Sequence, residues 1–402
     1  MNRMTKAIAL LLGLVISLSS SLSIAEDQIR SELAKPLQAA QELIKGKKFR
    51  DALDKLHEAD GITGKSAYEN LVTEQLRLVA STSAGDGPVA AKAYEALVAS
   101  GKLNPSDQQR YELAVANTFY QTKDYANAAT WGKRYQTEGG TDSQVETLIV
   151  QSYYLSGDYG SVTKRLQEHL KSGERLSETQ LQILGSSYLK LGDNANYAST
   201  LERLVAVYPK DEYWADLIHR VRTRPGFADR LSLDVGRLEQ AVGQLKTTEQ
   251  YVDQAELALQ AGLPVEAKAV IELGFSKGVL GTGADAERHN RLKDLAQKNA
   301  AKDLADLPKE EADASSSKDG NALVAVGLNH LASGNADKAA QLIQKGIEKG
   351  GLKRLDDARL HLGIALARSG QKSKAVETFQ AVQGADGTAD LARLWLAQAS
   401  KS

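Results

Sequence analysis

The 402-residue chain contains no cysteine, which excludes disulfides, thiolate metal ligands, a cysteine nucleophile and cysteine-linked lipid anchors. Proline is scarce, with 7 residues, whereas glycine accounts for 33. Neither sign of charge dominates, because Lys and Arg number 50 and Asp and Glu number 51, so composition gives no reason to expect nucleic acid or an anionic membrane as a partner. Few prolines, glycine punctuation and abundant helix-forming residues predict an all-α protein.

Local motifs for catalysis and metal binding are also missing from the sequence. The six histidines are widely separated and form no HExxH pair, and the sequence has no GxxxxGK[ST] phosphate loop. Residues 161–164 match the spelling SxxK, but the companion motifs of that chemistry do not occur. We therefore assign no catalytic residue, no metal site and no cofactor, and we expect the chain to fold without them.

The first 25 residues have the pattern of a secretory signal peptide. Two basic residues precede an apolar run from Ala7 to Leu18, and small residues follow as far as Ala25. That run is too short to span a hydrocarbon layer of roughly 30 Å. We expect cleavage after Ala25, a periplasmic location, and no stable membrane insertion of the mature chain.

A helix–turn–helix pattern recurs along the chain. Its turns fall at Lys123, Gly157 and Gly192, which are 34 and 35 residues apart. In the last of these copies, Tyr188 lies on the first helix and Leu201 on the second. A period near 34 residues with this Gly and Tyr pattern is the signature of tetratricopeptide repeats. We predict a right-handed superhelical solenoid of stacked helix pairs, with its clearest repeats at about residues 110–209.

The repeats are interrupted by one strongly polar segment. Residues 301–320 read AKDLADLPKEEADASSSKDG, in which charged and serine residues outnumber the larger apolar ones. Such a composition predicts a polar flexible linker. We therefore expect an N-terminal solenoid at residues 26–300 and a C-terminal pair of repeats at residues 321–402.

The first helix of each pair is expected to line a concave surface that binds proteins or extended peptide segments. Carboxamides on neighbouring helices can hydrogen-bond a peptide backbone, and tyrosines supply amphipathic contact area. We expect Asn117 and Gln151 to be exposed on that surface. The alternative is that these polar residues are solvated on an unused face. The predicted partner-binding residues are Asn117, Tyr120, Gln121, Gln151, Tyr154, Ser186 and Lys190.

In four segments the chain resembles the periplasmic tetratricopeptide-repeat proteins found with TonB–ExbB–ExbD energy-transducing systems in Proteobacteria. These segments are Leu204–Trp214 (LVAVYPKDEYW), Leu259–Gly281, Lys349–Arg354 (KGGLKR) and Leu391–Leu396. The resemblance implies a non-catalytic adaptor that binds a TonB-system component or an outer-membrane receptor and supports energised uptake. It carries over no catalytic residue. Two other functions stay open, namely a scaffold for envelope or exopolysaccharide assembly and export, and a periplasmic enzyme.

Overall fold

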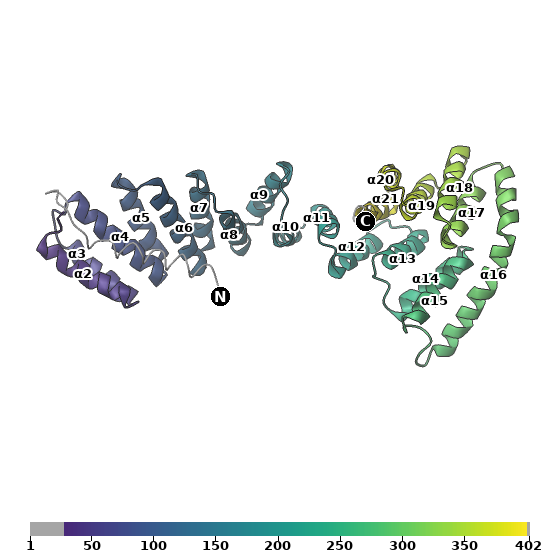
Figure 1. The fold of residues 1–402 in the computed structure, drawn as a ribbon, viewed down its shortest axis with the longest axis horizontal. Helices are drawn as coiled ribbons and strands as arrows, with labels where there is room; N and C mark the ends of the chain where they lie inside the picture. The colour runs from purple at the N-terminus through teal and green to yellow at the C-terminus, as the bar shows by residue number, and fades with distance from the viewer. Residues whose placement is uncertain (1–27, 400–402) are drawn as a thin grey trace. The chain divides into compact units, whose positions relative to one another are not determined.

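The computed structural model describes residues 28–399, so the predicted signal peptide lies outside the described residues. Within this range the regular elements are α-helices and one 3₁₀ turn, and none is a strand. The chain forms two compact units, one ending at Asp193 and the other beginning at Asn194. Figure 1 shows the helices of both units. The predicted all-α class is confirmed.

Unit 1 contains nine of the described helices: α2 (Ser31–Lys45), α3 (Phe49–Asp60), α4 (Ala67–Ala84), α5 (Gly87–Ala99), α6 (Pro105–Gln121), α7 (Tyr125–Thr137), α8 (Ser143–Leu155), α9 (Tyr159–Lys171) and α10 (Glu178–Lys190). The helices of unit 2 are α11 (Asn194–Val207), α12 (Asp211–Thr223), η2 (Asp229–Leu231), α13 (Ser232–Ala241), α14 (Thr248–Gln260), α15 (Pro264–Ser276), α16 (Ala286–Ser316), α17 (Asn321–Ala332), α18 (Ala336–Lys349), α19 (Leu355–Arg368), α20 (Lys372–Gln380) and α21 (Thr388–Ala399).

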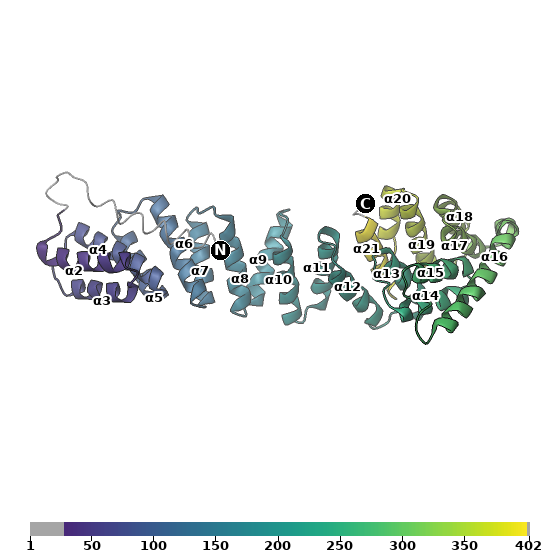
Figure 2. The same cartoon turned by 60° about the horizontal axis from the view of Figure 1, so that its bottom comes forward.

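Unit 1 is a stack of helix pairs, in which α2 packs on α3, α4 on α5, α6 on α7 and α8 on α9, followed by α10 (Figure 2). The first helices of neighbouring pairs also contact one another, as α4 does with α6, α6 with α8 and α8 with α10. Because a single pair cannot bury its apolar face alone, the core runs continuously from Leu33 on α2 to Leu148 on α8. This is the predicted tetratricopeptide-like stacking.

The turn between the two helices of a pair has a recurring backbone conformation. Its first residue has a positive φ, which is 81° at Gly157 and 65° at Lys123. This left-handed region suits glycine, because any other residue brings its Cβ close to the backbone. In the α4–α5, α6–α7 and α8–α9 pairs the next residue is an aspartate, namely Asp86, Asp124 or Asp158, whose side chain accepts a hydrogen bond from a backbone N–H of the following helix.

Unit 2 closes on itself, since its last helix returns to its first ones. Helix α21 contacts α11 and α13 as well as α19. Arg230, just before α13, donates hydrogen bonds to Asp357 at 2.9 and 2.7 Å and to Asp386 at 2.7 Å. Hydrogen bonds from Thr388 and Arg230 lower the pKa of Asp386 to about 2. The C-terminal repeats are therefore part of one compact unit with the helices that begin at Asn194.

The segment at residues 301–320, predicted to be a linker, is helical as far as Ser316 and belongs to α16. Small apolar residues make this possible, because Ala296, Ala300, Leu307 and Ala314 are buried along one stripe of the helix. Helix α16 packs against α15 and α17 through such contacts. The prediction of a polar flexible linker is wrong for residues 301–316, since Leu307 and Ala314 continue the apolar stripe of α16 through this charged segment.

The lysine in the turn of the α6–α7 pair generates a stability prediction. Replacing Lys123 by Gly should stabilise the protein by about 1 kcal/mol, because glycine adopts a positive φ without the steric cost of a Cβ. Urea unfolding followed by circular dichroism measures the change. The matched reverse substitution, Gly157→Lys, should destabilise by a similar amount. A less stable Lys123→Gly variant would contradict this account of the turn.

Candidate functional site

Hydrogen bonds join equivalent positions on three successive first helices of unit 1. The hydroxyl of Tyr120 on α6 donates to Oε1 of Gln151 on α8 at 3.0 Å. The hydroxyl of Tyr154 on α8 lies 2.8 Å from Oγ of Ser186 on α10. In both cases the tyrosine stands three residues before the turn of its own pair. We call these four residues the tyrosine ladder.

Each tyrosine of the ladder also packs against a second tyrosine on the helix that follows the turn. The ring centroids of Tyr120 and Tyr125 are 5.6 Å apart with an interplanar angle of 66°, and those of Tyr154 and Tyr159 are 5.5 Å apart at 65°. Such edge-to-face packing is favourable. Burial also raises the pKa of Tyr120 above its ordinary value. The ladder tyrosines are thus held both by a hydrogen bond and by an aromatic neighbour.

The ladder contains four of the seven residues predicted to bind a partner, and the other three lie close to it in sequence. Asn117 donates from Nδ2 to the carbonyl oxygen of Leu113 in its own helix at 2.9 Å. Asn117 and Gln151 are half-buried, so the prediction that both are exposed is wrong. The cause is the close approach of neighbouring first helices. Gln121 and Lys190 are exposed, and partner binding by this face stays a prediction.

Exposed leucines accompany the ladder, and the sequence analysis missed them. Leu155 is 48% exposed, Leu189 is 42% exposed and Leu191 is 52% exposed, and all three lie at the turn ends of α8 and α10. Leu155 occupies the repeat position that Gln121 has in the preceding pair. The sequence did carry a sign of this exposure, because Leu155 is apolar at a repeat position where the preceding pair has a polar residue. We call Gln121, Leu155, Leu189, Lys190 and Leu191 the ladder rim.

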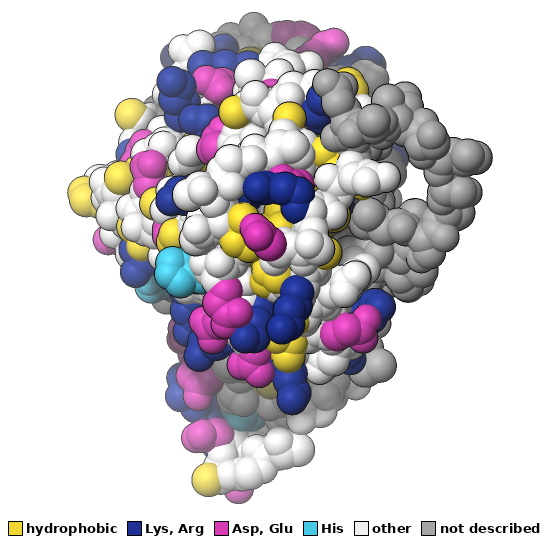
Figure 3. Space-filling view, turned by 90° about the vertical axis from the view of Figure 1, so that its left-hand side faces the viewer, with side chains coloured by type: hydrophobic (Ala, Val, Ile, Leu, Met, Phe, Trp, Pro, Cys, Tyr) yellow, Lys and Arg dark blue, Asp and Glu magenta, His cyan; other side chains and the backbone are white. Residues whose placement is uncertain are grey.

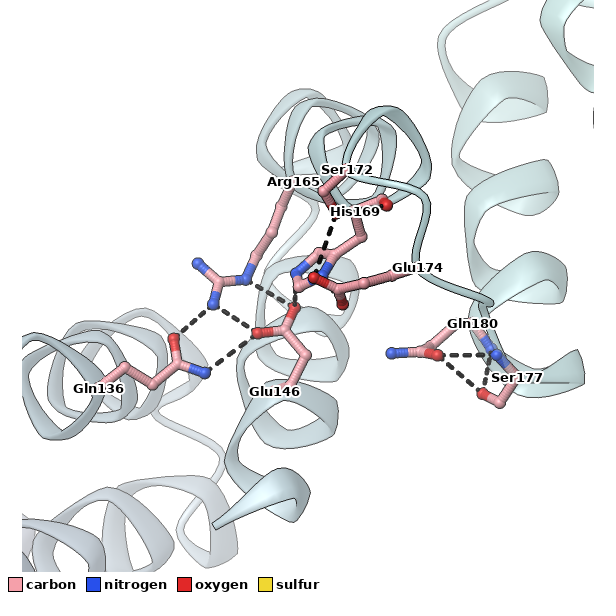
Figure 4. A network of polar contacts seen from close by, with 8 residues as sticks. All are labelled: Gln136, Glu146, Arg165, His169, Ser172, Glu174, Ser177 and Gln180. Carbon is pink, nitrogen blue, oxygen red and sulfur yellow. Dashed lines mark hydrogen bonds and ion pairs between the residues drawn. The ribbon is translucent and has the colours of Figure 1, made fainter. Parts of the chain in front are cut away.

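A polar network ties helices α7, α8 and α9 together around one carboxylate (Figure 4). Glu146 on α8 accepts hydrogen bonds from Nε of Arg165 at 2.8 Å and from Nε2 of Gln136 at 3.1 Å, and it lies 3.0 Å from Nε2 of His169. Burial tends to raise the pKa of Glu146, but the bonds from Arg165 and Gln136 outweigh it and the pKa is lowered. The carboxylate stays ionised and has a structural role in holding the pairs together.

A second carboxyl group in unit 1 has its pKa shifted in the opposite direction, upward. Glu112 on α6 is fully buried and accepts a hydrogen bond from the hydroxyl of Tyr94 at 2.6 Å. Arg134 lies 3.3 Å from it and stacks over the rings of Tyr94 and Trp131. Burial raises the pKa of Glu112 to about 7, against the opposing effect of the Tyr94 hydrogen bond. Because Tyr94 and Arg134, which contact it, belong to the helix packing of unit 1, we assign this carboxyl a structural role.

Unit 2 contains a buried ion cluster that connects α13, α15 and α19. Arg237 donates to Asp234 at 2.6 Å and to both carboxylate oxygens of Glu266 at 2.7 and 2.6 Å. His361 on α19 lies 2.8 Å from Asp234. Coulombic attraction to His361 and Arg237 outweighs burial and lowers the pKa of Asp234. Every charge in this cluster faces an opposite charge, so the cluster stabilises the closed unit.

The surface of unit 1 carries charges of both signs. A hollow of about 700 Å³ lies where α3 meets the turn between α4 and α5 and the end of α6. Its charged lining has both signs, with Arg50 and Arg77 beside Asp54, Asp86 and Asp124. Basic and acidic side chains are likewise interspersed on the side seen in Figure 3. Such a surface suits contact with a protein of mixed charge.

The part of the chain that the structure describes has neither a metal-binding cluster nor a membrane-spanning helix. Across residues 28–399, no three His, Asp or Glu side chains gather closely enough to hold a metal ion. Over the same residues, no helix combines the length and apolar character that crossing a membrane requires.

The ladder hydrogen bond between α6 and α8 can be tested by removing one hydroxyl. Tyr120→Phe should destabilise the protein by about 1 kcal/mol, because Oε1 of half-buried Gln151 loses its donor. Urea unfolding measures the difference. Tyr125→Phe is the matched control, since it keeps the edge-to-face ring contact and should change stability little. Equal effects of the two substitutions would show that the Tyr120 hydroxyl contributes nothing specific.

The raised pKa of Glu112 predicts a pH dependence of stability. In the unfolded chain the group loses its proton near the ordinary pKa of 4.5, whereas the folded chain keeps it to about pH 7. Raising the pH through this window therefore favours the unfolded state, and stability should fall between pH 4.5 and 7. Glu112→Gln should flatten this decline in urea unfolding measured across the window. An unchanged slope in the variant would assign the decline to other groups.

Comparisons with known proteins agree with the helix pairs described above. One family model of the tetratricopeptide repeat matches residues 83–143 and 325–390. A second family model of the tetratricopeptide repeat matches residues 181–211. No curated protein matches the chain. A chain of the solved structure of Naa15/Naa10 bound to HypK-THB is 17% identical, with a TM-score of 0.30 over 93% of the present chain, which spans 62% of that chain's length. The chain thus contains tetratricopeptide repeats in both of its compact units.

Proposed function

We propose that the protein is a non-catalytic adaptor that binds a partner protein on the tyrosine ladder and its rim. The observation that carries this proposal is the combination of fixed tyrosines with exposed leucines on successive first helices. Tetratricopeptide repeats are characteristic of protein-interaction scaffolds, which present extended surfaces of this kind.

The physics of the ladder favours a protein partner. Tyr120 and Tyr154 are held in place before any partner arrives, so little conformational entropy remains to be lost on binding. Exposed Leu155, Leu189 and Leu191 offer apolar area that gains free energy when a partner excludes water from it. Lys190 and Gln121 at the same rim can fix the orientation of that partner through polar contacts.

The finer part of the proposal is that this adaptor works in the periplasm and serves TonB-dependent transport. Its support is the sequence resemblance, together with the signal-like residues 1–25. The resembling segments include the turn at Pro209, the buried Trp214 and the turn at Gly350 and Gly351. Because these residues form turns and core, the resemblance supports a shared architecture and setting and does not supply binding residues.

The interaction site can be tested by polar substitution of the rim. A photo-crosslinking amino acid at Gln121 should capture a TonB-like protein or an outer-membrane receptor in cells. Leu155→Ser and Leu189→Ser together should weaken binding of that captured partner by about 2 kcal/mol, because two exposed apolar contacts are lost. The double variant should unfold at the same urea concentration as the parent, since both side chains are already exposed.

Leu355→Ser is the matched control, because this leucine is 39% exposed but lies in unit 2. It should leave the affinity unchanged. A deletion strain should also take up a scarce TonB-dependent substrate poorly while nutrients that pass through porins enter normally. Normal uptake, with crosslinks only to glycan-export proteins, would replace the transport role by the envelope-assembly role. Full affinity of the double variant would move the binding site away from the ladder.

A further inference from the structure

A buried carboxamide in unit 2 has no partner. Gln254 on α14 is 3% exposed, and neither its Nε2 nor its Oε1 has a hydrogen-bond partner among the described residues. Its position is fixed by α13, because a Cβ placed on Gly236 would lie only 2.9 Å from Cδ and Oε1 of Gln254. A glycine on the facing helix therefore makes room for this side chain.

Gln254 is costly to the fold in this position. A buried polar group without a partner typically destabilises a protein by about 1–3 kcal/mol, and an apolar side chain of similar size avoids that loss. Nine other described residues each have one buried side-chain atom without a hydrogen-bond partner, whereas in Gln254 both amide atoms lack one. A carboxamide with neither atom paired points to a group that is satisfied by something outside the chain.

The amide borders a hollow large enough to admit such a partner. The hollow has a volume of about 300 Å³ and lies between α13 and α14, with Arg222 of α12 at its edge. Pockets that bind ligands have volumes from roughly 300 to 1,000 Å³. On α14 the lining residues Gln250, Asp253, Gln254 and Leu257 follow helical spacing and so form one face. The hollow is a continuous surface and not a gap between unrelated loops.

The hollow is acidic. Its charged lining consists of Glu239, Asp253, Glu256 and Arg222. Glu239 is 3.3 Å from Arg222, and Glu256 is 3.2 Å from Arg288, whereas Asp253 is exposed and has no ion-pair partner among the described residues. Burial raises the pKa of Glu239 in spite of Arg222. A positive charge placed in this hollow would therefore be attracted to Asp253, and Glu239 and Glu256 add to the negative lining.

We propose that this hollow binds an extended peptide segment that carries a lysine or arginine side chain. A primary carboxamide presents one acceptor and a donor side by side, which matches the N–H and C=O of a peptide backbone. Nε2 of Gln254 donates to a backbone carbonyl of the segment, and Oε1 accepts from a backbone N–H. The basic side chain pairs with Asp253 and Glu239. The inference builds on the proposed interaction role but not on the tyrosine ladder or on a TonB-system partner.

Fluorescence anisotropy with the full-length mature protein tests this site. The probes are three labelled short peptides, namely one with alternating lysine and serine, one with glutamate in place of lysine, and one that keeps lysine but is N-methylated along its backbone. The lysine peptide should bind, and the glutamate and N-methylated peptides should bind about 10-fold more weakly, because each lacks one of the two recognised features. Equal binding of all three peptides, or no binding of the lysine peptide at about 1 mM, would overturn the proposal.

Variants of the protein separate binding from folding. Gln254→Leu should weaken the lysine peptide about 10-fold and yet melt at the same or a higher temperature, because the unpaired amide is gone. Gln344→Leu, at an exposed position on α18, is the matched control and should bind normally. If Gln254→Leu fails to fold, Asp253→Asn decides, since this exposed side chain can lose its charge without disturbing the core. Unchanged affinity in Asp253→Asn and in any folded Gln254→Leu would overturn the proposal and leave the ladder unaffected.

Discussion

The close contact between first helices of neighbouring pairs is the constraint on which unit 1 depends. Each pair has an apolar face that only the next pair can cover, so α4, α6, α8 and α10 approach one another along the stack. Polar residues on these helices cannot all stay in water at that distance. They bond to each other, as Tyr120 does to Gln151 and Tyr154 to Ser186. The ladder is therefore a consequence of stacking before it is a binding surface.

Unit 2 meets the same constraint by closure. Its final helix covers the faces that α11 and α13 would otherwise expose, and this junction is held by arginines that reach across it. Arg224 and Asp390 are 166 positions apart in sequence yet form an ion pair. Buried charges such as Arg237 are tolerated here because each has an opposite charge within hydrogen-bond distance. Closure thus depends on polar pairing as much as on apolar burial.

Sequence reasoning succeeded where the determinants are local and repeat. The turn at Gly157, the aspartate after it and the tyrosine before it follow from a period that can be read directly, and so do the helix pairs. It failed at α16 because Leu307 and Ala314 look unremarkable in a charged segment until their helical spacing is considered. It could not foresee the half-burial of Asn117, the closure of unit 2 or the isolation of Gln254, since these depend on partners distant in sequence.

The polar residues buried in this chain differ in what satisfies them, and that difference separates structure from function. Asp234 and Arg237 are buried and have partners within the chain, so replacing either would disturb packing without affecting a ligand. Gln254 has none among the described residues, although Gly236 leaves the space that positions it. Folding alone favours an apolar side chain there. A carboxamide kept unpaired beside an acidic hollow is therefore better explained by recognition of a partner than by stability.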